Sequence, residues 1–136
     1  MDFLLDTDTC IFIMKERPAE VKARLDEVGF DRVCLSVITV YELRYGAERH
    51  PNPIKARANL RAFLQPFRIL PWTDHCAGEA ARIRANLEKR GVMIGGYDVQ
   101  IAAHAKVLGL TAVSNNVGEF SRVEGLKLEN WCPPRA

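Results

Sequence analysis

The sequence lacks a long hydrophobic run and closely spaced cysteines. No apolar stretch reaches the roughly 20 residues that a membrane-spanning helix needs. No signal peptide is visible either, because acidic residues interrupt the N-terminal apolar run at once. The four cysteines lie far apart and include no C-x-x-C pair, so a thiolate metal site has no support. We therefore expect a cytoplasmic protein with reduced thiols and no membrane partner.

The chain also lacks a strong excess of charge of either sign. Its formal net charge is +2, and 48% hydrophobic and 26% charged residues are typical of a globular protein. The basic residues are unevenly spread, however. Six of them lie between Arg44 and Arg68, against the single acid Glu48, which leaves a local excess of five positive charges. Such a cluster either binds phosphate groups or forms a solvated helix face.

Short apolar runs alternate with helical segments along the chain. Strands are expected at 3–5, 33–36, 68–71, 111–114 and, weakly, 127–131. Helices are expected at 9–16, 18–28, 37–50, 53–64, 74–90 and 97–108. No repeat, linker or low-complexity segment divides the sequence. This order predicts a single α/β domain over residues 1–136, built on a mostly parallel sheet.

Polar residues occupy positions where such a domain would bury apolar ones. Asp6 ends the first strand, and Asn116 follows the strand at 111–114. Glu42 and Asp98 each share a helix face with apolar residues instead of lying opposite them. Because each helix of a parallel α/β sheet begins where a strand ends, all four positions are expected at one edge, where ligands bind.

Taken singly, each of these residues has an ordinary explanation. Asp6 or Asp8 could cap the next helix, and Asp98 could interact with a helix dipole. Glu42 could form an ion pair with Arg44 or Arg82, and Asn116 could make a turn.

Taken together, the three carboxylates predict a metal site. At a separation of ~4 Å and an effective dielectric of ~20, each like-charged pair costs about 4 kcal/mol. A divalent cation relieves this repulsion, and oxygen ligands suit Mg²⁺ or Mn²⁺ rather than zinc. A carboxylate-held Mg²⁺ commonly serves phosphate chemistry. The predicted metal ligands are Asp6, Glu42 and Asp98.

Four segments together resemble the PIN-domain ribonucleases, and more narrowly the VapC toxins of type II toxin–antitoxin pairs. In order, they read LLDTDTCI, LSVITVYELRYGAER, IGGYDVQIAAHAKVLGLTAVSNNVGEF and RVEGLKLENW. The resemblance implies a PIN-like three-layer α/β/α sandwich, a homodimer and Mg²⁺-dependent endonucleolytic cleavage of RNA. In enteric relatives the RNA is a tRNA. It also implies a VapB-like antitoxin whose tail fills the active-site groove.

The resemblance further implies roles for individual residues. Asp6, Glu42 and Asp98 correspond to metal-binding acids, and Asn116 stands at a fourth catalytic position that is acidic in wider PIN domains. Glu119 is the candidate substitute for that missing acid. We expect Glu42 to help position the attacking water, and basic residues to hold the RNA backbone. These basic candidates are Arg44, Arg49, Arg57 and Arg61.

Two alternatives remain open from the sequence. The first is a haloacid-dehalogenase-like phosphohydrolase, because D-T-D after an apolar strand resembles its nucleophile motif, with Asp6 phosphorylated. Against it, Cys10 stands where that motif has a small hydroxyl residue, and no aspartate follows Asp98. The second is a catalytically weak PIN module that only binds RNA or a protein, which Asn116 favours.

Overall fold

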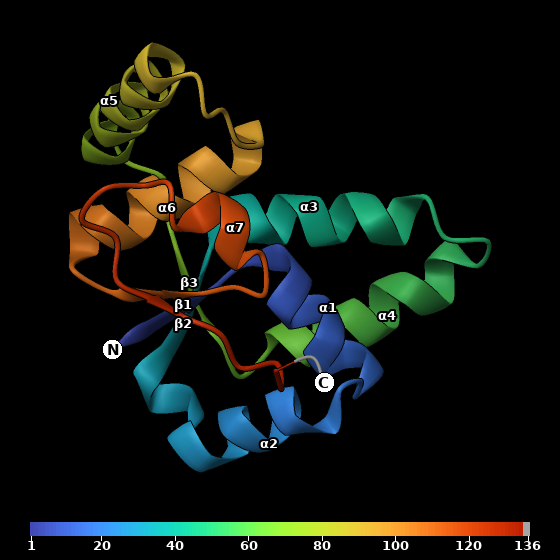
Figure 1. The fold of residues 1–136 in the computed structure, drawn as a ribbon. Helices are drawn as coiled ribbons and strands as arrows, with labels where there is room; N and C mark the ends of the chain where they lie inside the picture. The colour runs from blue at the N-terminus through green and yellow to red at the C-terminus, as the bar shows by residue number, and fades with distance from the viewer. Residues whose placement is uncertain (135–136) are drawn as a thin grey trace.

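A five-stranded parallel sheet forms the centre of the computed structural model, which describes residues 1–134 (Figure 1). The strand order is β3–β2–β1–β4–β5, and every pairing is parallel. The strands are β1 (Phe3–Leu5), β2 (Val33–Ser36), β3 (Arg68–Leu70), β4 (Thr111–Val113) and β5 (Leu128–Glu129). The predicted strands are confirmed, each within three residues at either end.

Helices cover both faces of this sheet (Figure 1). They are α1 (Thr7–Lys15), α2 (Ala19–Val28), α3 (Val37–Glu48), α4 (Pro53–Leu64), α5 (Asp74–Arg90), α6 (Gly96–Leu108) and α7 (Val117–Phe120). A 3₁₀ turn, η1 (Phe30–Arg32), leads into β2. The six predicted helices are confirmed, whereas the four-residue helix α7 was not predicted.

Local sequence signals set the helix ends. The Ser36 hydroxyl accepts a hydrogen bond from the Ile38 N–H, which caps α3. Gly91 and Gly109 end α5 and α6 in the left-handed conformation, with φ of 70° and 67°. Helix α1 begins two residues earlier than predicted because Asp6 is its N-cap.

Alternate residues along β1 belong to two separate hydrophobic clusters, one on each face of the sheet. Phe3 and Leu5 of β1 pack with α1, α2, α3 and α4 on one face of the sheet. Leu4 packs with α5, α6 and α7 on the other face. Since side chains alternate across a strand, one short run supplies both cores. This arrangement confirms the predicted three-layer α/β/α sandwich. Within residues 1–134, no helix is both long and apolar enough to cross a bilayer.

The order in which strands are added to the sheet reverses at β1, although all five strands run parallel. From β1 the chain builds outward through β2 to β3, and then returns to place β4 on the other side of β1. The Asp6 N–H donates to the Val113 carbonyl oxygen (3.0 Å), which ties the ends of β1 and β4 together. Ligands of open α/β sheets bind at such a switch point, beyond the carboxyl ends of the strands.

Candidate functional site

Asp6 lies buried at the end of β1, with only 2% of its surface exposed. Its Oδ1 accepts a hydrogen bond from the Thr9 N–H (2.8 Å), so the predicted capping role is confirmed. Burial raises the pKa of Asp6, hydrogen bonds from Ser114 and Thr9 lower it, and repulsion by Asp8 raises it further. Capping and a place at the sheet edge are therefore compatible in one side chain.

Glu42 projects from α3 toward the start of α1. The Thr7 hydroxyl donates to its Oε1 at 2.6 Å, and also contacts the Thr39 hydroxyl at 3.4 Å. Among the ion pairs of residues 1–134, none includes Glu42, and Arg82 pairs with Glu79 instead. The alternative of a Glu42 ion pair with Arg44 or Arg82 is therefore wrong. This half-buried carboxylate is therefore held by a neutral hydroxyl and not by a cationic side chain.

Asp98, in the first turn of α6, lies where the acids converge. Its pKa is raised to about 7, first by burial, then by a hydrogen bond with Glu119 and by repulsion from Asp6, Glu119 and Glu42. Asp98 therefore lies within electrostatic reach of both Asp6 and Glu42. The structure adds Glu119 of α7, which the sequence suggested only as a substitute for a missing acid.

Asn116 joins two of these acids. Its Nδ2 donates to Glu119 Oε2 at 2.8 Å and lies 3.5 Å from Asp98 Oδ2. Its backbone N–H donates to the Ser114 hydroxyl, which fixes the turn after β4. The turn role and the site role of Asn116 are thus both present. A neutral amide here supplies a donor between two carboxylates that would otherwise repel each other.

The candidate metal-ligand atoms of Asp6, Glu42 and Asp98 are all carboxylate oxygens, the ligand type that Mg²⁺ and Mn²⁺ prefer. Burial and, to a smaller extent, repulsion from neighbouring acids raise the pKa of Asp98, and a divalent cation would relieve that repulsion. Within residues 1–134, however, no three His, Cys, Asp or Glu side chains are close enough to hold one ion as they stand. The assignment of Asp6, Glu42 and Asp98 as metal ligands therefore stays a prediction. The chemistry of their carboxylate groups is compatible with it.

The four candidate RNA-binding arginines lie exposed on α3 and the following segment through α4. Arg57 donates two hydrogen bonds to Glu48, at 2.7 and 2.6 Å, which compensates its charge locally. The Arg49 guanidinium lies 4.9 Å from the centre of the Tyr45 ring. Arg44 and Arg61 are exposed and therefore accessible to a ligand.

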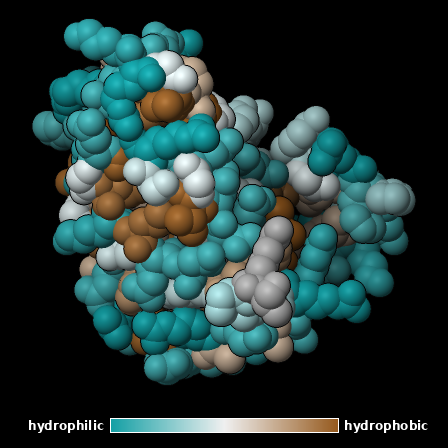
Figure 2. Space-filling model, viewed as in Figure 1, coloured by the Kyte–Doolittle hydropathy of each residue, from teal (hydrophilic) through white to brown (hydrophobic). Residues whose placement is uncertain are grey.

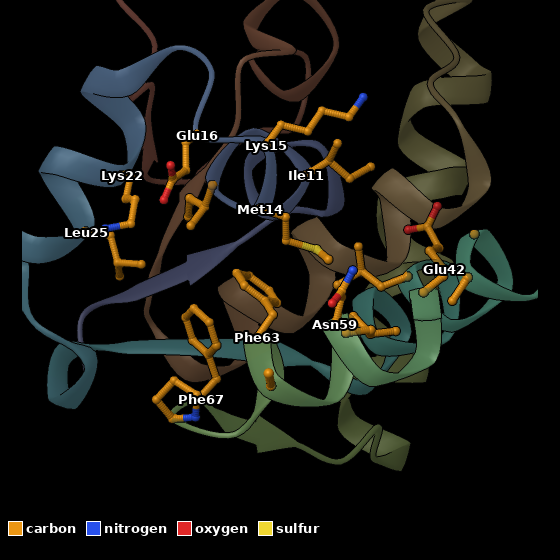
Figure 3. Close-up of a pocket in the computed structure, with 18 of the residues that line it drawn as sticks. Ile11, Met14, Lys15, Glu16, Lys22, Leu25, Glu42, Asn59, Phe63 and Phe67 are labelled. Atoms are coloured by element: carbon orange, nitrogen blue, oxygen red, sulfur yellow. The ribbon is translucent and has the colours of Figure 1, made fainter. Parts of the chain in front are cut away.

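Two features of this region were missed from the sequence. The first is an apolar cavity of about 900 Å³ among α1, α2, α3 and α4. Figure 3 shows Glu42 at one end of it, with Met14, Phe63 and Phe67 farther along. The surface view shows hydrophobic side chains inside the corresponding hollow (Figure 2).

The second missed feature is a contact between Tyr41 and Tyr97. Their ring centres lie 5.6 Å apart. The only signal in the sequence was that each tyrosine directly precedes a predicted site acid, Glu42 or Asp98.

Comparison with known proteins agrees with this fold and site. The family profile of the PIN domain matches residues 3–126. The chain is 39% identical over 132 residues to the tRNA(fMet)-specific endonuclease VapC of Salmonella typhimurium, covering 97% of this chain and 99% of that protein. It is 41% identical over 131 residues to Ribonuclease VapC2 of Haemophilus influenzae, covering 96% and 98%.

Solved structures of similar proteins include toxin–antitoxin complexes. DNA-bound VapBC from Salmonella typhimurium contains a chain that matches with a TM-score of 0.92 and 39% identity, over 97% of this chain and 99% of that one. VapBC2 from Rickettsia felis, bound to a promoter fragment, matches with a TM-score of 0.90 and 30% identity, over 97% and 100%. Neither comparison supports the haloacid-dehalogenase alternative. The chain belongs to the PIN domain family, and within it to the VapC group.

Proposed function

We propose that this protein is a metal-dependent endoribonuclease that acts as the toxin of a type II toxin–antitoxin pair in the cytoplasm. The observation that carries the proposal is the position of Asp98, whose pKa is raised by burial and by repulsion from acids that include Asp6 and Glu42, two residues of other segments. The names of the similar proteins, which are ribonucleases and a tRNA-specific endonuclease, support the same activity. They also make tRNA the first substrate to test.

Asp6 and Asp98 would hold the Mg²⁺ or Mn²⁺ ion, with Glu42 beside them. When bound, the ion would lower the pKa of water and neutralise charge on the phosphoryl oxygens. Asp6 is fixed for this role by the Thr9 N–H. The Thr7 hydroxyl fixes Glu42, whose free oxygen is suited to accept a hydrogen bond from the water that attacks the phosphodiester in line.

Asn116 acts on the orientation of the acids, in this proposal, and not on the RNA. By donating to Glu119 and approaching Asp98, it keeps two carboxylates side by side that repel each other. The RNA backbone would lie against the exposed basic face, where Arg44, Arg49, Arg57 and Arg61 could contact phosphates. Such contacts position a nucleic acid without reading its sequence.

The antitoxin would occupy the apolar cavity that ends at Glu42. Exposed apolar hollows of this size mark partner surfaces, and an amphipathic segment laid in one is a common binding mode. An antitoxin segment bound along the whole cavity, from Phe67 past Phe63, would also reach Glu42 (Figure 3). The homodimer stays a prediction, to be checked by sedimentation equilibrium of the purified protein.

The decisive experiment incubates the purified protein with total RNA and with purified tRNA, with and without Mg²⁺. We expect discrete cleavage products that excess EDTA abolishes. Asp6→Asn and Asp98→Asn should show no cleavage while keeping the circular dichroism spectrum of the parent. Cleavage that persists in EDTA or in either variant would contradict the proposal. Binding of RNA without cleavage, retained in both variants, would instead favour the non-catalytic PIN module.

A partner test uses a candidate antitoxin encoded beside this gene. Co-expression should abolish RNA cleavage by the parent protein. Phe63→Glu in the cavity should weaken that inhibition, because burying an unpaired carboxylate is costly. Equal inhibition of the parent and the variant would show that the antitoxin binds elsewhere.

A further inference from the structure

Tyr41 of α3 and Tyr97 of α6 form an aromatic pair on the surface. Their ring centres are 5.6 Å apart with an interplanar angle of 54°, and the Tyr97 hydroxyl donates to the Tyr41 hydroxyl at 3.4 Å. The two residues keep 54% and 44% of their surface exposed. Since the rings contact each other but neither is buried in a core, their apolar faces remain available to a ligand.

The pair lies at the rim of the acidic site. Each tyrosine is the residue directly before a site acid on the same helix, Glu42 or Asp98. The ring contact bridges α3 and α6, the two helices that carry these acids. Because both rings are exposed, the pair presents an aromatic surface between the two acid-bearing helices.

The Tyr41–Tyr97 pair, we propose, is a stacking platform for an unpaired base next to the scissile phosphate. The inference rests on the nuclease function proposed above and assigns it two positioning residues. Proteins bind single-stranded RNA by stacking bases on exposed aromatic rings, while the bases of a duplex are already stacked on each other. A platform at this rim would therefore favour loops and single strands over duplexes.

Charge favours a base over other groups at this position. The tyrosine rings are neutral and offer no cation to pair with a phosphate, whereas a neutral base can stack on them beside the carboxylates. A second copy of the chain fits less well, because a symmetric contact through this rim would bring two acidic sites together. Tyr45, one turn farther along α3, offers a matched comparison because the Arg49 guanidinium lies over its ring.

The experiment compares Tyr41→Leu and Tyr97→Leu with the corresponding Phe variants. Cleavage is measured on an oligoribonucleotide spanning the site that the parent protein cuts. Stacking contributes about 1–3 kcal/mol per base, so each Leu variant should lower kcat/KM by about 5- to 150-fold, mainly through KM. Each Phe variant should stay close to the parent because it keeps the ring. Tyr45→Leu, the control, should change kcat/KM little.

A second arm replaces single bases beside the cleavage site with abasic residues. When the stacked base is removed, kcat/KM of the parent should fall by the same factor as the Leu substitution causes on the intact RNA. The Leu variants should cleave the abasic and the intact RNA with the same kcat/KM. Additive losses at every position, or equal losses in the Leu and Phe variants, would overturn the platform. So would Leu variants that dissociate in sedimentation experiments and regain activity at high protein concentration, since the pair would then bind a second copy.

The two proposals fail in different ways. If the parent cleaves no RNA, the nuclease function is wrong and the platform is wrong with it. If the parent cleaves RNA and the Leu variants match it, only the platform is wrong. Because both side chains are exposed, the variants should fold, and their thermal unfolding is compared with that of the parent.

Discussion

The Thr7 hydroxyl donates a hydrogen bond of 2.6 Å to Glu42 Oε1, across 35 residues of sequence. Thr7 opens α1 directly after Asp6, and Glu42 lies in α3. The bond therefore sets the direction of one site acid from the residue next to another. A hydroxyl can do this without neutralising the carboxylate, which an arginine in the same place would do.

Removing this hydroxyl should impair cleavage without unfolding the protein. In Thr7→Val, Glu42 loses its donor, and we expect kcat on RNA to fall by about ten- to a hundredfold because misplaced catalytic groups are costly. Thr7→Ser, which keeps the hydroxyl, should restore most of the activity. If the Val and Ser variants are equally active, Glu42 does not depend on this bond.

Metal binding should stabilise the fold and depend on pH. A ligand present at 100 times its Kd stabilises the native state by about 2.7 kcal/mol, so saturating Mg²⁺ or Mn²⁺ should raise Tm. The pKa of Asp98 is raised to about 7, and protons therefore compete with the metal below neutral pH. The affinity measured by calorimetry should accordingly be weaker at pH 6 than at pH 8, and Asp98→Asn should lose both the affinity and most of its pH dependence.

Adding a carboxylate at position 116 should make the protein depend more on its metal. Asn116→Asp removes the amide donor to Glu119 and adds a negative charge near Asp98. Without metal, we expect a loss of on the order of 1 kcal/mol in unfolding free energy, and with Mg²⁺ a recovery of that loss. Asn115→Asp is the control, since Asn115 is exposed and accepts from Asn130 instead. An equal loss in both variants would contradict the role of Asn116.

Buried His104 should make the protein less stable in mild acid. Its Nδ1 lies 2.8 Å from the Ser36 hydroxyl, and burial lowers its pKa below the usual histidine value of 6.5. Below that value the unfolded chain binds a proton that the native state does not, so stability falls as pH drops through the lowered pKa. In urea denaturation between pH 7 and pH 5, His104→Asn should lose less stability than the parent. An unchanged pH dependence would show that other groups dominate.

Most of the fold could be predicted because its signals are local. Buried parallel strands are short continuous apolar runs. The capping residue Ser36 marks a helix start, and the glycines Gly91 and Gly109 mark helix ends. Helix α7 was missed because four residues are too few to show a helical period. The start of α1 was misplaced because Asp6, regarded mainly as a site residue, also caps that helix.

The site was predictable in part. Asp6, Glu42 and Asp98 could be selected because acids on apolar faces or at strand ends need a reason to be there. Their hydrogen-bond partners could not be selected in the same way. Nothing in the sequence says that Thr7 holds Glu42, or that Asn116 lies between Asp98 and Glu119. The Tyr41–Tyr97 contact and the apolar cavity were equally invisible.

The sequence by itself determined the order of strands and helices, the edge of the sheet that carries the acids, and the family. Periodicity, caps and motif order express these properties over neighbouring residues. Only the tertiary structure decided which donor holds each carboxylate, that Asp98 carries the raised pKa, and that two tyrosines meet at the rim. Those outcomes depend on ångström-scale distances between segments far apart in the chain, which packing alone fixes.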